Sequence, residues 1–223
     1  MDYEIRTFND IYDVVQGYGD SAMTTVVYRG VRRTDFTLLP KIGRLQGFEC
    51  ATLDVRAERF ILTLFKQQAL PHLGFVPTSD WEWLAVGQHH GLPTRLLDWS
   101  RNPLVACYFA VEEDCSGDSV VYALRDRTSI DIANTNPFEI SGVGRVIPTH
   151  ITPRITAQAG LFTVHGDPCT PFETESLDRL IIPNRIRREL KKVLYKFGIH
   201  RASLFPGLDG LSRHIQWLRT NEH

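Results

Sequence analysis

Apolar residues recur every three or four positions in several segments, and this spacing is typical of helices with one buried face. The pattern predicts helices over residues 8–17, 49–68, 81–90, 103–111, 184–197 and 211–218. Residues that commonly mark helix boundaries support these bounds. Asn102-Pro103 combines an N-cap residue with proline at the first helical position. Gly91 and Gly198 stand where a left-handed residue would end a helix.

Short runs of β-branched and aromatic residues predict strands over 24–30, 119–124, 161–165 and 180–182. Residues 92–99 form a strand or a taut loop, because Pro93 keeps Leu92 out of the helical region. Polar segments broken by Gly, Pro and Asn predict loops over 31–48 and 126–150. The elements do not alternate regularly, so we expect an α+β fold. This would be one compact domain over residues 1–223, with helices packed around a mixed or antiparallel central sheet.

The composition is that of an ordinary globular protein, with 43% hydrophobic and 23% charged residues among 223. No window supplies the roughly 18 uncharged apolar residues of a membrane span, and the first residues lack the features of a secretory signal. The four cysteines are widely spaced, which argues against a zinc site or a disulfide framework. We therefore expect a cytoplasmic protein with reduced thiols, no metal and no membrane partner.

The formal net charge is -1, so the chain as a whole lacks the charge of a nucleic-acid-binding protein. Basic residues nevertheless gather in the predicted helix 184–197, where Arg185, Arg188 and Lys192 share one stripe. Such a stripe can follow the phosphates of a nucleic acid. The alternative is the solvated polar face of an amphipathic helix.

Polar side chains are concentrated between residues 88 and 100, at a predicted helix end and the extended run after it. Segments held between rigid elements commonly carry functional sites. If residues 94–100 are extended, side-chain alternation places Thr94, Asp98 and Ser100 on one side. We expect that side to face a cleft. The alternative is that Asp98 anchors loops by accepting backbone hydrogen bonds.

Two histidines and one arginine are further candidates. His89 and His90 are adjacent, so they point in different directions on a helix, and no third metal ligand stands at helical spacing. One of them can act as a hydrogen-bond donor or general base, or both can be packed. Arg29 closes the strand 24–30. Its guanidinium can hold a phosphate or carboxylate through two hydrogen bonds, or it can pair structurally with a carboxylate such as Asp98.

Taken together, these motifs resemble the FRG domain, which is named for an aromatic-Arg-Gly signature. That signature corresponds here to Tyr28-Arg29-Gly30, followed at 89–106 by His-His-Gly-Leu-Pro-Thr-Arg-Leu-Leu-Asp-Trp-Ser-Arg-Asn-Pro-Leu-Val-Ala. A further matching piece is Gln158-x-Gly160-x-Phe162-Thr163, and the resemblance extends over about residues 20–218. There are two departures: Tyr28 is the first signature residue, and Ser100 stands where threonine is common.

By analogy, the resemblance implies an enzyme similar to ADP-ribosyltransferases, in which a first-strand Arg holds the phosphates of NAD and a late acidic residue orients the ribose. It implies catalytic roles for Arg29, Asp98 and Gln158. Gln158 stands where the acid is expected, yet a glutamine cannot stabilise a ribosyl cation as a carboxylate does. Asp98, Glu173 or Glu175 would then have to serve. The residues implied to bind NAD are Tyr28, Gly30, His90, Thr94, Arg95, Trp99, Ser100 and Phe162.

The first functional hypothesis is therefore an ADP-ribosyltransferase or NAD glycohydrolase, acting as a toxin or defence effector on a protein or nucleic-acid target. The second is a non-catalytic module that binds a nucleotide or nucleic acid, with an affinity that falls as salt rises. A nucleic-acid hydrolase using His90 and Asp98 is the third. Convergence of Arg29, Asp98 and Gln158 in one cleft would favour a site, whereas a closed Arg29–Asp98 pair would favour a structural role.

Overall fold

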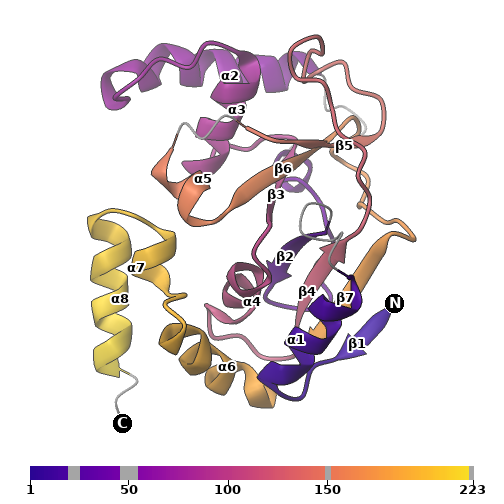
Figure 1. Cartoon of the computed structure of the whole chain (residues 1–223). Coiled ribbons are helices and arrows are strands. Elements are labelled where there is room, and N and C mark those ends of the chain that lie inside the picture. The colour runs from indigo at the N-terminus through magenta and orange to yellow at the C-terminus, as the bar shows by residue number, and fades with distance from the viewer. Residues whose placement is uncertain (20–25, 46–54, 149–151, 221–223) are drawn as a thin grey trace.

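A seven-stranded mixed sheet runs through the molecule in the order β1-β7-β4-β2-β3-β6-β5 (Figure 1). The computed structural model describes residues 1–19, 26–45, 55–148 and 152–220. β1 and β7 pair in parallel, and the pairs joining the other strands are antiparallel. The open sheet with helices around it confirms the predicted α+β class. The strands are β1 (Asp2–Glu4), β2 (Val27–Val31), β3 (Leu96–Ser100), β4 (Ser119–Leu124), β5 (Val143–Val146), β6 (Gly160–His165) and β7 (Leu177–Ile182).

The predicted helices are present. One of them begins, and two of them end, at the boundary residues that the sequence predicts. Asn102 accepts a hydrogen bond from the Leu104 N–H at the start of α4, and Gly91 and Gly198 adopt φ of 86° and 76°. Residues 24–25 and 49–54 of predicted elements lie outside the described residues. The helices are α1 (Phe8–Gly17), α2 (Val55–Ala69), α3 (Asp80–His89), α4 (Pro103–Val111), α5 (Pro153–Ala157), α6 (Asn184–Lys196), α7 (Arg201–Leu204) and α8 (Leu208–Thr220), with short 3-10 helices η2 (Ile42–Arg44) and η4 (Leu70–His72).

The short elements β1, β5, α5 and α7 were not predicted, nor were the 3-10 helices η2 and η4, of which η2 lies in the predicted loop 31–48. The prediction of a continuous loop over 126–150 is wrong where β5 forms. Residues 143–146 carry no alternating apolar pattern, and they become a strand because the edge of β6 offers them backbone partners, with Val146 opposite Phe162. Tertiary pairing decides such short strands more than local propensity does.

Apolar side chains of the sheet form three cores. On one face, α1, α4 and α6 cover β2, β4 and β7 around residues such as Tyr28 and Leu180. Farther along the sheet, α2 and α3 pack over β3, β5 and β6 around Leu96. The third core includes Trp99 and Leu38. Since side chains alternate along a strand, Leu96 and Trp99 of β3 serve different cores.

The backbone of α4 lies unusually close to β2 at Gly30. A Cβ atom added to Gly30 would stand 1.8 Å from the carbonyl oxygen of Ala106 and 2.6 Å from the backbone nitrogen of Ala110. No side chain fits in that space, so the glycine of the Tyr-Arg-Gly signature is explained by helix–strand packing. The contact fixes α4 directly over the strand that carries Arg29.

Arg95 and Glu58 form a buried ion pair between β3's leading segment and α2. Their side chains are 2% and 1% exposed, and Arg95 Nη2 lies 2.6 Å from Glu58 Oε2. Arg95 also donates to the carbonyls of Pro137 and His165, and its guanidinium stands over the Phe138 ring at 5.3 Å. One guanidinium thus holds together α2, β6 and the segment before β5.

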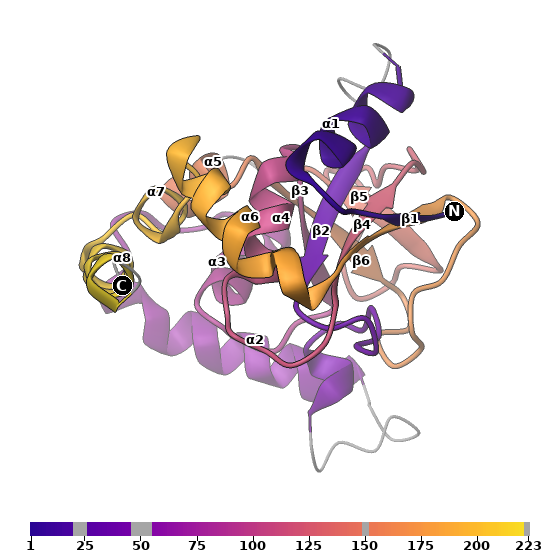
Figure 2. The same cartoon turned by 90° about the horizontal axis from the view of Figure 1, so that it is seen from below.

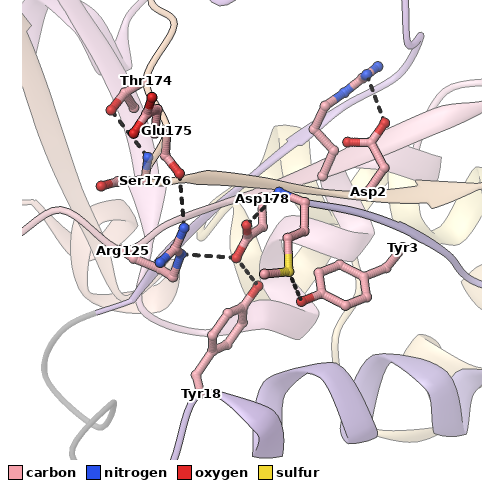
Figure 3. A network of polar contacts seen from close by, with 10 residues as sticks. Asp2, Tyr3, Tyr18, Arg125, Thr174, Glu175, Ser176 and Asp178 are labelled. Carbon is pink, nitrogen blue, oxygen red and sulfur yellow. Dashed lines mark hydrogen bonds and ion pairs between the residues drawn. The ribbon is translucent and has the colours of Figure 1, made fainter.

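A buried carboxylate joins three distant parts of the chain at β7 (Figure 3). Asp178 accepts from the amino group of Met1 at 2.8 Å and from the Tyr18 hydroxyl at 3.1 Å, and it pairs with Arg125 Nε at 3.1 Å. Burial and the Asp178 charge raise the pKa of Tyr18. The phenol therefore stays protonated and continues to donate. This network fastens the end of α1 and the residues after β4 to the sheet.

Cys107 and Cys115 are free thiols, whereas Cys169 is disulfide-bonded, so the expectation of reduced thiols is wrong for Cys169. None of the helices in the described ranges has both the length and the apolarity to cross a membrane. The cytoplasmic location stays a prediction, as does the extent of the domain over residues 1–223.

The Gly30→Ala substitution is expected to destabilise the protein by at least about 2 kcal/mol, because the new methyl group meets backbone atoms that cannot rotate away. Chemical denaturation monitored by circular dichroism would measure this. Gly17→Ala is the matched control, since nothing lies within 4 Å of a Cβ there. Equal stabilities of the two variants would contradict the packing role of Gly30.

Glu58→Gln is expected to lower the free energy of unfolding by about 3–5 kcal/mol, because it leaves the Arg95 charge buried without its partner. Combining it with Arg95→Met should recover much of that loss. Glu139→Gln is the control, because it breaks an ion pair with Arg59 whose side chains are 67% and 42% exposed, worth at most about 1 kcal/mol. Urea titrations of the four proteins would decide, and a loss as small for Glu58→Gln as for Glu139→Gln would rule out the buried pair.

Candidate functional site

Strands β2 and β3 separate soon after they meet. Among the described residues they share a single backbone pair, Tyr28 with Ser100. Beyond that pair, a side chain replaces the backbone pairing of the two strands: Arg29 Nη1 donates to the carbonyl oxygen of Asp98 at 2.7 Å. A side chain thereby satisfies an acceptor of β3 that β2 leaves unpaired, and a gap opens between the two strands.

A pocket of about 390 Å³ occupies this gap. It brings together the three predicted catalytic residues, Arg29, Asp98 and Gln158. Four of the predicted binding residues also line it, namely Tyr28, Gly30, Trp99 and Ser100. The arrangement is therefore an open site, although Arg29 and Asp98 also contact each other. Lining residues that were not predicted are Val31, Arg32, Phe36, Arg44, Ala106, Phe109, Glu112, Glu113 and Arg154.

Arg29 is the central cation of the pocket. Its side chain is 20% exposed, and burial lowers its pKa, although the nearby Asp98 charge opposes that effect. Its Nε is buried and has no hydrogen-bond partner among the described residues. Buried polar groups are nearly always satisfied in native proteins. An unsatisfied guanidinium nitrogen at a pocket wall therefore points to a ligand that carries an acceptor.

Arg154 adds a second cation from α5. Its Nη1 donates to the carbonyl oxygen of His89 at 2.6 Å, and its guanidinium stands 4.5 Å from the centre of the Phe205 ring. Like that of Arg29, the Nε of Arg154 is buried without a partner among the described residues. Burial lowers the pKa of Arg154, and the charge of Asp98 opposes this.

Asp98 is held in place by a relay of side chains. Its Oδ2 accepts from Gln88 Nε2 at 2.7 Å, and Gln88 Oε1 in turn accepts from the Thr94 hydroxyl at 2.6 Å. The same Oδ2 lies 3.7 Å from Arg29 Nη1. The carboxylate is 45% exposed, so it is oriented and still open to a ligand. Gln88 lies in the polar segment 88–100, and no local pattern in that segment predicts this role.

The polar atoms of Gln158 and Ser100 serve mainly to shape the pocket. Ser100 Oγ donates to the Gln158 carbonyl at 2.7 Å and accepts from the Asn102 N–H at 2.9 Å. Gln158 Nε2 donates to the Leu204 carbonyl at 3.0 Å. The next residue, Ala159, adopts φ of 45°, a left-handed conformation that costs a non-glycine residue roughly 1 kcal/mol. Several contacts thus hold a strained turn beside the pocket.

Four predicted binding residues lie outside the pocket. His90 is exposed at the end of α3, and Arg95 is bound to Glu58. Phe162 is buried near the His89 ring, at 5.7 Å between centroids. The expectation that Thr94 faces a cleft with Asp98 and Ser100 is wrong, because Thr94 is fully buried. Its hydroxyl accepts from the Leu96 N–H and donates to Gln88, which in turn holds Asp98. Thr94 therefore affects the pocket only indirectly.

Two acidic residues of the pocket, Glu112 and Glu113, directly follow α4. Glu112 pairs with Arg201, and Glu113 pairs with Arg32. One feature indicates that these two glutamates lie near the core. The preceding helix α4 is buried nearly all round, so residues directly after it lie close to the core. Of the other candidate acids, Glu173 lines a separate hollow, and Glu175 does not line the pocket that contains Arg29.

The wall behind Trp99 contains a buried histidine. Trp99 Nε1 donates to Thr163 Oγ1 at 2.9 Å, and Thr163 Oγ1 lies 2.9 Å from His165 Nε2. Because the threonine oxygen already accepts from Trp99, its own proton is free to go to an unprotonated Nε2. Burial and the charges of Arg29 and Arg95 lower the pKa of His165 to about 4, in agreement with a neutral ring.

Two of the three basic residues predicted to bind nucleic acid lie together. Arg188 and Lys192 line one hollow beside α6, whereas Arg185 lines a different hollow and lies 3.5 Å from Glu4. In the described part of the chain, no three His, Cys, Asp or Glu side chains are placed to hold a metal. The absence of a metal nevertheless stays a prediction.

The fold and pocket define an α+β protein with a cationic site where its sheet divides. In a comparison with protein-family models, residues 24–119 match the FRG domain, which confirms the resemblance found in the sequence. The matched segment contains Arg29 and Asp98 but not Gln158. Comparisons with curated proteins and with solved structures gave no match.

The low pKa of His165 predicts how stability depends on pH. An unfolded histidine binds a proton below about pH 6.5, but the folded ring does so only near pH 4. The free energy of unfolding should therefore fall as the pH drops from 6.5 to 4, by roughly 3 kcal/mol from this group. Urea denaturation at several pH values should show a weaker decline for His165→Gln, and identical slopes would refute this prediction.

Proposed function

We propose that the pocket between β2 and β3 binds NAD and cleaves its nicotinamide–ribose bond, as an ADP-ribosyltransferase or NAD glycohydrolase does. The observation that carries this proposal is the convergence of Arg29, Asp98 and Gln158 in one open pocket of about 390 Å³. That volume lies in the usual range for small-molecule sites. The FRG domain match is compatible with this function but does not specify it.

The cations suit the pyrophosphate of NAD. Arg29 and Arg154 each have a buried Nε that lacks a partner among the described residues, and Arg44 lines the same pocket. Guanidinium groups bind phosphates through charge-assisted hydrogen bonds, often two at a time. Tyr28 and Phe109 also line the pocket and supply aromatic surface against which a planar ring can pack.

The carboxylate of Asp98 suits the reacting centre. In the proposed reaction, the bond between ribose C1′ and the nicotinamide nitrogen breaks, and its electron pair leaves with nicotinamide. The positive charge that develops on the ribose is stabilised by a carboxylate fixed beforehand, which Gln88 orients through Oδ2. A water or acceptor group then bonds to C1′, and its proton passes to Asp98 or to solvent.

Glu112 or Glu113 can supply the carboxylate that Gln158 lacks. A glutamine cannot supply the charge of the acidic residue expected there, but both glutamates line the pocket. Their ion pairs with Arg201 and Arg32 hold them in place. We assign the missing carboxylate to one of these two residues.

A non-catalytic nucleotide-binding module is the competing function. It is favoured by Gln158, whose amide is engaged by the Leu204 carbonyl. Such a module would hold NAD or another nucleotide at the same arginines without turnover. The two functions differ only in nicotinamide release, so one experiment separates them.

Arg29→Ala is expected to weaken NAD binding by about 10- to 100-fold, since it removes charge-assisted hydrogen bonds to the pyrophosphate. Asp98→Asn should leave binding within a few-fold but slow nicotinamide release by roughly 100-fold or more. Calorimetry measures the first quantity, and chromatographic assay of nicotinamide measures the second.

Arg33→Ala is the matched control, because Arg33 pairs with Asp35 on the surface and does not line the pocket. It should bind and react like the unaltered chain. Binding of NAD without nicotinamide release, with water, protein or nucleic acid offered as acceptor, would favour the non-catalytic module. Absence of both binding and release would refute the proposed site.

A further inference from the structure

A second hollow, of about 400 Å³, lies between the end of α4 and the helices α6, α7 and α8. Figure 2 shows α8 beside α7 at one side of the molecule, away from the sheet. Apart from Glu113 and the Glu112–Arg201 pair, none of its lining residues has a part in the proposed reaction. Its character is aromatic and basic, with a lining that includes Tyr108, Lys191, Tyr195, His200, His214 and Trp217.

The aromatic rings form one continuous cluster. His200 and His214 stack at 4.1 Å between centroids with 12° between their planes, and Trp217 continues the stack at 6.1 Å from His214. Tyr195 lies 5.6 Å or 5.7 Å from each of these three rings. Tyr195 is 39% exposed. Four rings thus border one hollow. The exposed ring of Tyr195 can stack against a planar group of a ligand.

The two histidines act here as neutral aromatic groups. Burial lowers the pKa of both His200 and His214, and for His200 the neighbouring imidazole adds to the effect. Charge at this hollow comes from Lys191, Arg201 and Arg213 and from the two glutamates Glu112 and Glu113. Lys191 stands 5.4 Å from the centre of the Trp217 ring, and Arg213 is an exposed cation of α8.

A basic hollow of about 140 Å³ adjoins the aromatic one and shares Lys191 and Trp217 with it. Arg188 and Lys192 reach it from the exposed side of α6. Arg187, in contrast, is buried and donates to backbone carbonyls such as that of Glu113. The exposed pair therefore supplies the positive charge that a ligand would meet.

We propose that these adjoining hollows bind single-stranded nucleic acid, with one base against Tyr195 and Trp217 and the backbone phosphates on Arg188 and Lys192. Proteins that bind single strands combine these two features, aromatic platforms for the bases and a basic groove for the phosphates. The base must be unpaired, because a base within a duplex cannot leave its partner to enter a hollow without the cost of unpairing.

The position of this surface suggests what the strand is for. Glu112 and Glu113 line both the aromatic hollow and the pocket that contains Arg29. A strand bound at α6 and α8 would therefore extend beside that pocket. If the proposed function holds, the nucleic acid is the acceptor: a base nitrogen or hydroxyl oxygen bonds to ribose C1′, nicotinamide leaves with the electron pair, and the acceptor's proton passes to Asp98 or solvent.

Fluorescence anisotropy with labelled single-stranded DNA and RNA oligonucleotides of mixed sequence tests the binding. Tyr195→Ala and Trp217→Ala should each weaken binding on the order of 10-fold, because each removes one stacking platform. Tyr195→Phe should retain binding, since it keeps the ring. Tyr12→Ala is the matched control, because Tyr12 is exposed on α1 and lines none of the hollows described above.

The salt dependence tests the phosphate contacts separately. Replacing Arg188 and Lys192 together with Gln should reduce the slope of log affinity against log salt by about 1.4, at roughly 0.7 per phosphate contact on a single strand. Lys196→Gln, on the same helix but outside both hollows, should leave the slope unchanged.

Three results would overturn the proposal: no binding of either oligonucleotide, equal binding of duplex and single strand, or affinities that Tyr195→Ala and Trp217→Ala leave unchanged. These results are independent of NAD. Nicotinamide release with water as acceptor should be the same in Tyr195→Ala as in the unaltered chain. A loss of strand binding with intact release would therefore concern this surface alone, whereas release absent from every variant would concern the Arg29 pocket.

Discussion

The contact between α4 and β2 at Gly30 is the constraint on which the rest of the site depends. A helix backbone can come this close to a strand only where the strand has no side chain, and Gly30 provides that position. The buried helix then covers β2 while α3 covers β3. The two helices belong to different cores, and the pocket forms along the division between them.

That division has an electrostatic consequence. With β2 and β3 paired only at Tyr28 and Ser100 among the described residues, the carbonyl of Asp98 needs another donor, and Arg29 supplies it. A guanidinium is thereby drawn into the gap at some desolvation cost, which lowers its pKa. Arg29 also lines the pocket and has a buried Nε without a partner among the described residues. We therefore assign both a structural and a ligand-binding role to this residue.

Charge around the pocket is balanced by arginines from distant parts of the sequence. Glu112 and Glu113 follow α4 directly, yet they pair with Arg201 of α7 and Arg32 after β2. These two glutamates also border the aromatic hollow between α6 and α8. The end of α4 therefore connects the two candidate ligand surfaces, and a change in the position of this helix would alter both.

The sequence by itself determined the long helices, the central strands and the family resemblance, because periodicity, capping residues and a continuous motif are local properties. The family resemblance in the sequence also pointed to Arg29, Asp98 and Gln158 as the candidate catalytic residues. Only the tertiary structure decided which polar residues can contact a ligand in the pocket. Thr94 and Arg95 are engaged in buried contacts within the protein. Glu112 and Arg154 line the pocket, and Gln88 binds the Asp98 carboxylate. The reason is physical, since a residue's partners depend on segments far away in the chain, and alternation along one strand cannot tell a cleft from a core.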